Sequence, residues 1–97
     1  MSRVEASMRH QIGVPQMMYG IDYPHFEGVY PTTRENIRAT LTASGADAAE
    51  LRAILGENAV RCYGFDPVAL APHVERVGPE IEELLEPIGA EDAGRVY

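Results

Sequence analysis

Apolar residues recur every three or four positions along most of the chain, which is the spacing of one face of an α-helix. Val4, Met8 and Ile12 form the first such face. A capping-box pattern of Thr32 and Glu35 begins another helix, because the two side chains can satisfy backbone N–H groups at its start. The whole pattern predicts helices over residues 3–12, 33–43, 47–63 (where Gly56 can divide the run into two), 66–77 and 81–88.

One short stretch has a different period. Residues 16–22 follow a proline, are too short for a helix and are predicted as a β-strand. Alternation gives the strand two faces, which are Met17, Tyr19 and Ile21 on one side and Met18, Gly20 and Asp22 on the other. Both faces are largely apolar, which is typical of a strand covered on two sides. A lone strand leaves its backbone donors and acceptors unpaired, so residues 16–22 are expected to need neighbouring strands.

Residues 23–33 follow this stretch and contain two prolines and a glycine, which indicates a loop. The loop begins directly after Asp22 and carries His25. On the residues alone, Asp22 has an ordinary explanation as a carboxylate that caps the following turn. His25 has an ordinary explanation as a loop histidine with one backbone hydrogen bond.

Size and charge narrow the function classes. A chain of 97 residues allows one small domain, and its net charge of −7 argues against nucleic acid and anionic membrane surfaces as partners. The single cysteine, Cys62, cannot form an internal disulfide, which suits a reducing compartment. With no signal peptide pattern and no membrane-spanning run, the cytoplasm is the expected location.

Three stretches of sequence give the chain a family resemblance. Residues 20–28 read GIDYPHFEG, residues 30–37 read YPTTRENI and residues 53–66 read AILGENAVRCYGFD. In these motifs the chain resembles the C-terminal part of the amidohydrolase-related family, whose members are metal-dependent hydrolases and decarboxylases on a TIM-like barrel. Ile21 departs from the pattern, because many members carry serine there.

The resemblance implies an α/β fold, namely the C-terminal fragment of a (β/α)8 TIM-like barrel with one strand plus mostly helices. Residues 1–66 would be the last helix–strand–helix portion, and residues 67–97 a helical C-terminal extension with a frayed tail. Residues 16–22 would be the eighth strand. Catalytic groups of such barrels lie at the C-terminal ends of the strands, which is where Asp22 stands.

The resemblance also implies roles for Asp22 and His25. In the family a divalent metal ion, often zinc, activates a water, and the carboxylate after the eighth strand binds the metal or takes the proton. That role carries over to Asp22, as a catalytic and metal-binding residue. His25 would contact substrate or orient Asp22. The aromatic residues Tyr23, Phe26 and Tyr30 would line a pocket, or would pack down as a lid.

The expected activity is hydrolysis of a C–N or C–O bond, or decarboxylation, of a small-molecule substrate. The family's other metal ligands, its histidines, have no counterpart here, and a catalytic zinc needs about three protein ligands. The chain is therefore expected to act with a missing N-terminal barrel portion or to self-associate. The alternative is a non-catalytic helical binding or oligomerisation module. In either case the Asn58 side chain is expected to tie the helical ending to the barrel or to cap the second half of the helix, and Cys62 is expected to be buried.

Overall fold

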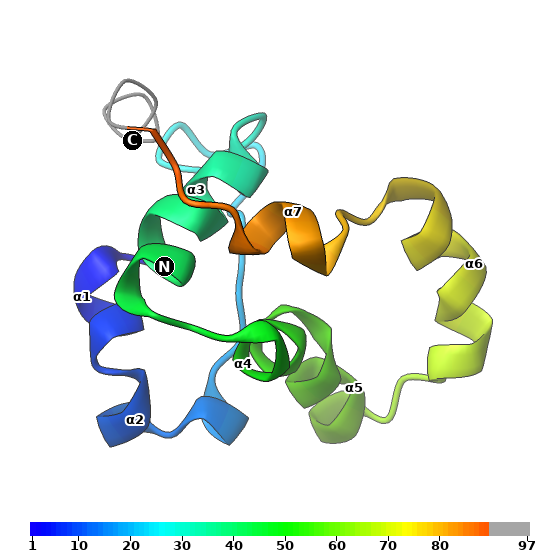
Figure 1. Cartoon of the computed structure of the whole chain (residues 1–97). Coiled ribbons are helices and arrows are strands. Elements are labelled where there is room, and N and C mark those ends of the chain that lie inside the picture. The colour runs from blue at the N-terminus through cyan, green and yellow to red at the C-terminus, as the bar shows by residue number, and fades with distance from the viewer. Residues whose placement is uncertain (90–97) are drawn as a thin grey trace.

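Residues 1–89 are described by the computed structural model, and short helical segments dominate them. The segments follow one another around a small core (Figure 1). In chain order they are α1 (Arg3–Ser7), α2 (Arg9–Ile12), η1 (Val14–Gln16), α3 (Thr33–Thr40), η2 (Thr42–Ser44), α4 (Ala48–Arg52), η3 (Ala53–Glu57), α5 (Asn58–Tyr63), α6 (Pro67–Val77) and α7 (Ile81–Leu85).

Local capping explains where several of these helices begin. Asp47 accepts a hydrogen bond from the Glu50 N–H at the start of α4, and the Glu50 side chain reaches back to Asp47. Asp66 caps α6 in the same manner through two backbone N–H groups. The start predicted at Thr32 is in the right place, but its capping box is wrong, because the Thr32 hydroxyl donates to the Val29 carbonyl instead.

Residues 48–63 are helical without interruption. The predicted break at Gly56 is absent, since η3 is a single π-helical turn that joins α4 directly to α5. Such a turn inserts one extra residue into the helical ladder and rotates the faces on either side of it. Leu51, Ile54 and Asn58, which stand three and four residues apart, are all buried.

The core is formed by side chains from both halves of the described chain. α1 contacts α3, η1 contacts η3, and α7 lies against α3 and α4. The core residues are Ala6, Met17, Ile37, Leu41, Ala46, Leu51, Ile54 and Leu84.

The apolar face predicted for residues 3–12 is wrong. Val4, Met8 and Ile12 are 66%, 43% and 43% exposed, and the helix breaks at Met8 into α1 and α2. Arg9 is buried instead, because it forms an ion pair of 2.7 Å with Glu50 and donates to two backbone carbonyls. A buried guanidinium is stable only when paired in this way.

The predicted α/β fold is also wrong. Residues 1–89 contain no β-strand, so the described chain is a helical domain and not a barrel fragment with one strand. Of the predicted strand, Gln16 belongs to η1, and residues 17–21 run extended as a single light-blue trace to Asp22, whose φ is 56° (Figure 1). A strand requires a ladder of backbone bonds to a second extended segment. The Tyr19 N–H donates instead to the Ile54 carbonyl of η3, at 3.1 Å.

The alternation predicted for this segment is nevertheless confirmed, whereas the expectation that both of its faces are covered is wrong. Met17 is buried and Tyr19 and Ile21 are half-buried, whereas Met18, Gly20 and Asp22 are exposed. The period of two therefore belongs to a segment that packs one face on helices without entering a sheet.

α6 stands at one side of the molecule with all of its residues exposed (Figure 1). The predicted C-terminal extension begins with this helix, and the part of it after residue 89 lies outside the described residues. No helix within residues 1–89 combines the length and the apolar character that crossing a bilayer requires.

Candidate functional site

The extended segment that leads to Asp22 is held by side chains of α5. The Asn58 amide, 1% exposed, donates to the carbonyls of Val14 and Met17 at 2.7 and 2.8 Å. Arg61 donates to the Pro15 carbonyl and to the Asn58 side-chain oxygen. Asn58 thus ties the helical ending to residues 14–17 and fixes where the segment starts.

A second contact holds the middle of the segment. The Tyr19 hydroxyl donates to the side-chain oxygen of Asn36, which is 1% exposed on α3. Burial raises the pKa of Tyr19 to about 12, because the phenolate is poorly solvated there. The Asn36 amide nitrogen has no hydrogen-bond partner among the described residues. Tyr19 is therefore anchored at its backbone by η3 and at its ring by α3.

The loop after the segment is closed by backbone hydrogen bonds. His25 N–H donates to the Asp22 carbonyl at 2.8 Å, Gly28 N–H to His25 at 2.9 Å, and Val29 N–H back to Ile21 at 3.1 Å. A side chain at Gly28 would not fit, since its Cβ would lie 2.7 to 2.9 Å from three carbonyl oxygens. These bonds give residues 22–28 a defined shape. Asp22 directly follows Ile21, whose carbonyl is bound by Val29 where the two ends of the loop meet.

Asp22 and His25 are brought together on this loop. The His25 Nδ1 lies 3.7 Å from an Asp22 carboxylate oxygen, and their side chains are 53% and 72% exposed. Asp22 is the only residue other than glycine among the described residues with a positive φ, at 56°. That left-handed conformation carries a penalty of about 1 kcal/mol for a residue with a side chain, although aspartate tolerates it better than most. The structure therefore presents a carboxylate and an imidazole side by side on the surface.

Exposed aromatic rings surround this pair. Tyr23 and Tyr30 meet edge to face at 5.0 Å between ring centroids, and His25 stacks on Phe26 at 4.9 Å. Phe26 is 88% exposed, and Tyr23 and Tyr30 are 64% and 63% exposed. The rings neither line an enclosed pocket nor pack down as a lid over the described residues.

The donor set is too small for a catalytic zinc site. Asp22 and His25 supply two ligand side chains, and no group of three or more His, Cys, Asp or Glu residues gathers within residues 1–89. A catalytic zinc takes about three protein ligands and keeps one open position. His10 lies 3.5 Å from Glu50, but Arg9 binds the same carboxylate oxygen. The residues described here do not by themselves fit the metal that the resemblance implies.

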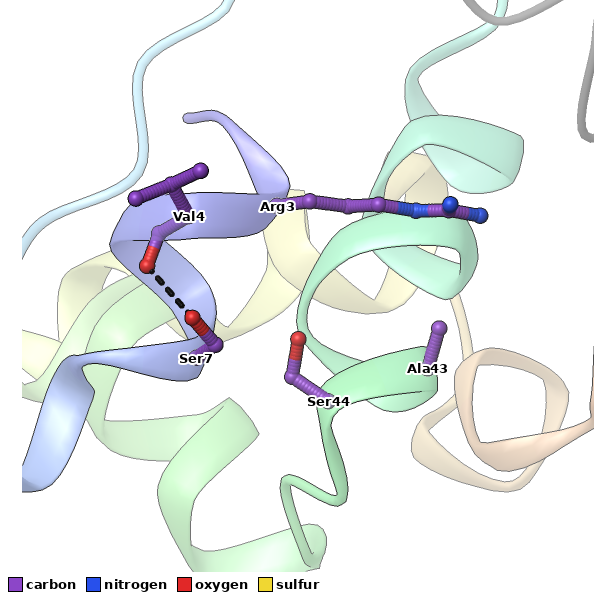
Figure 2. A pocket seen from close by; sticks show the side chains of 5 residues that line it. All are labelled: Arg3, Val4, Ser7, Ala43 and Ser44. Carbon is purple, nitrogen blue, oxygen red and sulfur yellow. Dashed lines mark hydrogen bonds between the residues drawn. The ribbon is translucent and has the colours of Figure 1, made fainter.

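Neither Asp22 nor His25 lines the two surface hollows described next. An open groove of about 460 Å³ is lined by Arg3, Val4, Ser7, Ala43 and Ser44, between α1 and η2 (Figure 2). In this groove Ser7 donates to the Val4 carbonyl, and the Arg3 Nε donates to that of Ala39. A second hollow of about 270 Å³ includes Met17 and Met18 of the extended segment.

Two of the polar anchors were missed by the sequence interpretation, and one residue was misplaced. Asn36 could have been noticed, because it shares the inward side of its helix with Ile37, Thr40 and Leu41. Arg9 gave no such signal. Cys62 is exposed, which corrects the prediction that it is buried.

No family model, no curated protein and no solved structure matches this chain.

Proposed function

We propose that this chain contributes Asp22 and His25 to the active site of a metal-dependent hydrolase of the amidohydrolase-related type. The single observation that carries the proposal is the placement of the Asp22 carboxylate. It is 72% exposed, 3.7 Å from an imidazole, and held at a φ of 56°. A carboxylate kept where glycine would be less strained is expected when the carboxylate itself has a task.

The hydrogen bonds that hold the chain on either side of Asp22 agree with a catalytic role for its carboxylate. Residues 17–22 are anchored by two buried amides, Asn36 and Asn58, and the loop after them is closed by backbone bonds. Catalysis requires side chains that stay in place, because a misplacement of about 1 Å lowers rates strongly. Asp22 is the general base of the proposed site, and His25 orients it or contacts the substrate.

Two donors leave the site incomplete, and a catalytic zinc takes about three protein ligands. We propose that the remainder of the enzyme supplies the missing ligands, and that the divalent metal, zinc in the first instance, is held by both parts together. The substrate is a small molecule with a C–N or C–O bond to hydrolyse, or with a carboxylate to release. The sequence motifs around Asp22 and Asn58 support this assignment.

The test is complementation. The chain is co-expressed with the polypeptide encoded directly upstream, loaded with zinc, and assayed against amides, esters and carboxylated rings. Asp22→Asn is expected to reduce turnover by about 100-fold or more, as the loss of a general base does. Glu27→Gln is the matched control, because it removes one carboxylate from the same exposed loop, and it should leave turnover within about twofold. Near-normal turnover of Asp22→Asn, or no restored activity, contradicts the proposal.

A second candidate is a non-catalytic helical binding or oligomerisation module, and α6 favours it. Val68, Val74 and Val77 of this helix are 79%, 61% and 63% exposed, beside an exposed Phe65. Apolar surface gathered on one element often marks a contact with another protein. Under this candidate Val74→Lys would abolish association of the chain with its partner, whereas Asp22→Asn would leave it unchanged.

A further inference from the structure

The loop after Asp22 carries a group of aromatic rings that do not join the core. Phe26, Tyr23 and Tyr30 are 88%, 64% and 63% exposed, and none of them packs against the core of the described chain. Backbone hydrogen bonds close the loop, so the rings are not needed to hold its shape. Apolar side chains gathered on one exposed element often mark a site of interaction. We call Tyr23, His25, Phe26 and Tyr30 the ring cluster.

The ring cluster leaves aromatic faces open to solvent. Tyr23 and Tyr30 meet edge to face at 5.0 Å between ring centroids. His25 stacks on one face of Phe26 at 4.9 Å, with an angle of 28° between the rings, so the opposite face of Phe26 is open. The face of an aromatic ring carries negative potential from its quadrupole, and it therefore attracts cations.

The charge beside the ring cluster has the same sign as the ring faces. The Asp22 carboxylate is 72% exposed and lies 3.7 Å from the His25 Nδ1. Residues 22–30 contain no lysine or arginine, and Arg34, the next arginine along the chain, lies 3.2 Å from a Glu83 carboxylate oxygen. The loop thus offers ring faces and a carboxylate together, without a basic side chain of its own to occupy them.

We propose that the ring cluster and Asp22 bind an organic cation, namely a methylated ammonium or a guanidinium group. The cation lies on the open face of Phe26, and Asp22 balances its charge. Such cations are weakly hydrated, so they lose less hydration on contact with a ring than a compact ion does. An uncharged ligand would gain nothing from the carboxylate. This inference goes beyond the proposed function, because it needs neither a metal ion nor side chains from outside this chain.

The test uses tetramethylammonium as the probe. It is titrated into the 97-residue chain at constant ionic strength, while NMR follows the ring protons of Phe26 and the tyrosines. We expect saturable shifts that are half complete at about 1–10 mM, because the contacts are few and the site is open. tert-Butyl alcohol has a similar shape without the charge, and it should bind at least about tenfold more weakly.

Variants assign the binding to the ring face and to the carboxylate. Phe26→Leu keeps an apolar side chain but removes the ring, and it should weaken binding of tetramethylammonium by about fivefold or more. Asp22→Asn removes the charge and should weaken binding by about threefold or more. Phe65→Leu is the matched control, because Phe65 is an exposed phenylalanine outside the loop, and it should leave binding unchanged. Circular dichroism of each variant verifies that the helices are intact.

Equal affinity for tetramethylammonium and tert-butyl alcohol overturns the proposal, and so does unchanged affinity in Phe26→Leu. N-acetylarginine amide is the second probe and identifies the source of the cation. Tighter binding of this guanidinium supports an arginine side chain of a polypeptide as the natural occupant, and tighter binding of tetramethylammonium supports a free small molecule. All of these measurements use the chain alone, so their failure leaves the enzyme assignment standing, and failed complementation leaves the cation site standing.

Discussion

The buried amide of Asn58 offers the sharpest test of how the segment before Asp22 is held. Asn58→Ala removes both hydrogen bonds to the carbonyls of Val14 and Met17, at a position that is 1% exposed. Each lost bond accounts for about 1 kcal/mol, and carbonyls left without partners add to the loss, so the free energy of unfolding should fall by about 2–4 kcal/mol. This is a large share of the roughly 5–15 kcal/mol typical of a domain.

The assay is urea unfolding of the 97-residue chain followed by circular dichroism. Arg61→Ala is the comparison, because it removes hydrogen bonds to the neighbouring Pro15 carbonyl and to the Asn58 side-chain oxygen but leaves the Asn58 N–H donors in place, and its side chain is exposed, so it should lower stability by less than about 1 kcal/mol. Asn58→Asp keeps the shape but loses the N–H donors, so it should be as destabilised as the alanine variant at neutral pH. Equal effects of Asn58→Ala and Arg61→Ala would refute the reasoning.

Three further predictions concern single side chains. The hydrogen bond from Arg9 lowers the pKa of Glu50 from its ordinary 4.5, so the stability that Glu50 contributes is present above that pH and is lost as pH falls through the lowered pKa. Glu50→Gln should therefore weaken the pH dependence of the unfolding free energy below pH about 4.5, as urea titrations at several pH values would record. Tyr19, with its pKa raised from 10 to about 12, should be a late-titrating member among five tyrosines in ultraviolet absorbance, and Tyr19→Phe should abolish that late step. Because its pKa is raised, the stability linked to Tyr19 is complete below pH 10 and declines as pH rises toward 12. Asp22→Gly should raise the free energy of unfolding by about 0.5–1 kcal/mol by relieving the positive φ, whereas Asp22→Asn should leave it nearly unchanged.

The helices were foreseeable where their signals are local. Asp47 and Asp66 cap α4 and α6 through residues two or three positions away, so the sequence itself contains both partners of each contact. The fold class was not foreseeable in this way. The alternation of residues 17–22 is local and correct, but whether an alternating segment joins a sheet depends on a partner that its own residues do not specify.

The polar anchors were missed for the same physical reason. Arg9 is buried only because Glu50, 41 residues later, accepts its N–H, and Asn36 meets Tyr19 across 17 residues. Before those contacts are known, an arginine or an asparagine on a short helix is expected to face water. Asn58 was predicted as a tie because an amide can bind backbone carbonyls, but the identity of the carbonyls came only from the packing of α5 on η1.

The Asn58 side-chain amide and the Ile54 carbonyl bind backbone groups of residues 17–21, as a neighbouring strand would in a sheet. Asn58 and Ile54 satisfy backbone groups at Met17 and Tyr19, and so the segment can stay extended in a helical domain. Met18 and Gly20, which lie on either side of Tyr19, have no backbone hydrogen bond to any described residue. Asp22 ends the segment, because its φ of 56° turns the chain into the loop that follows.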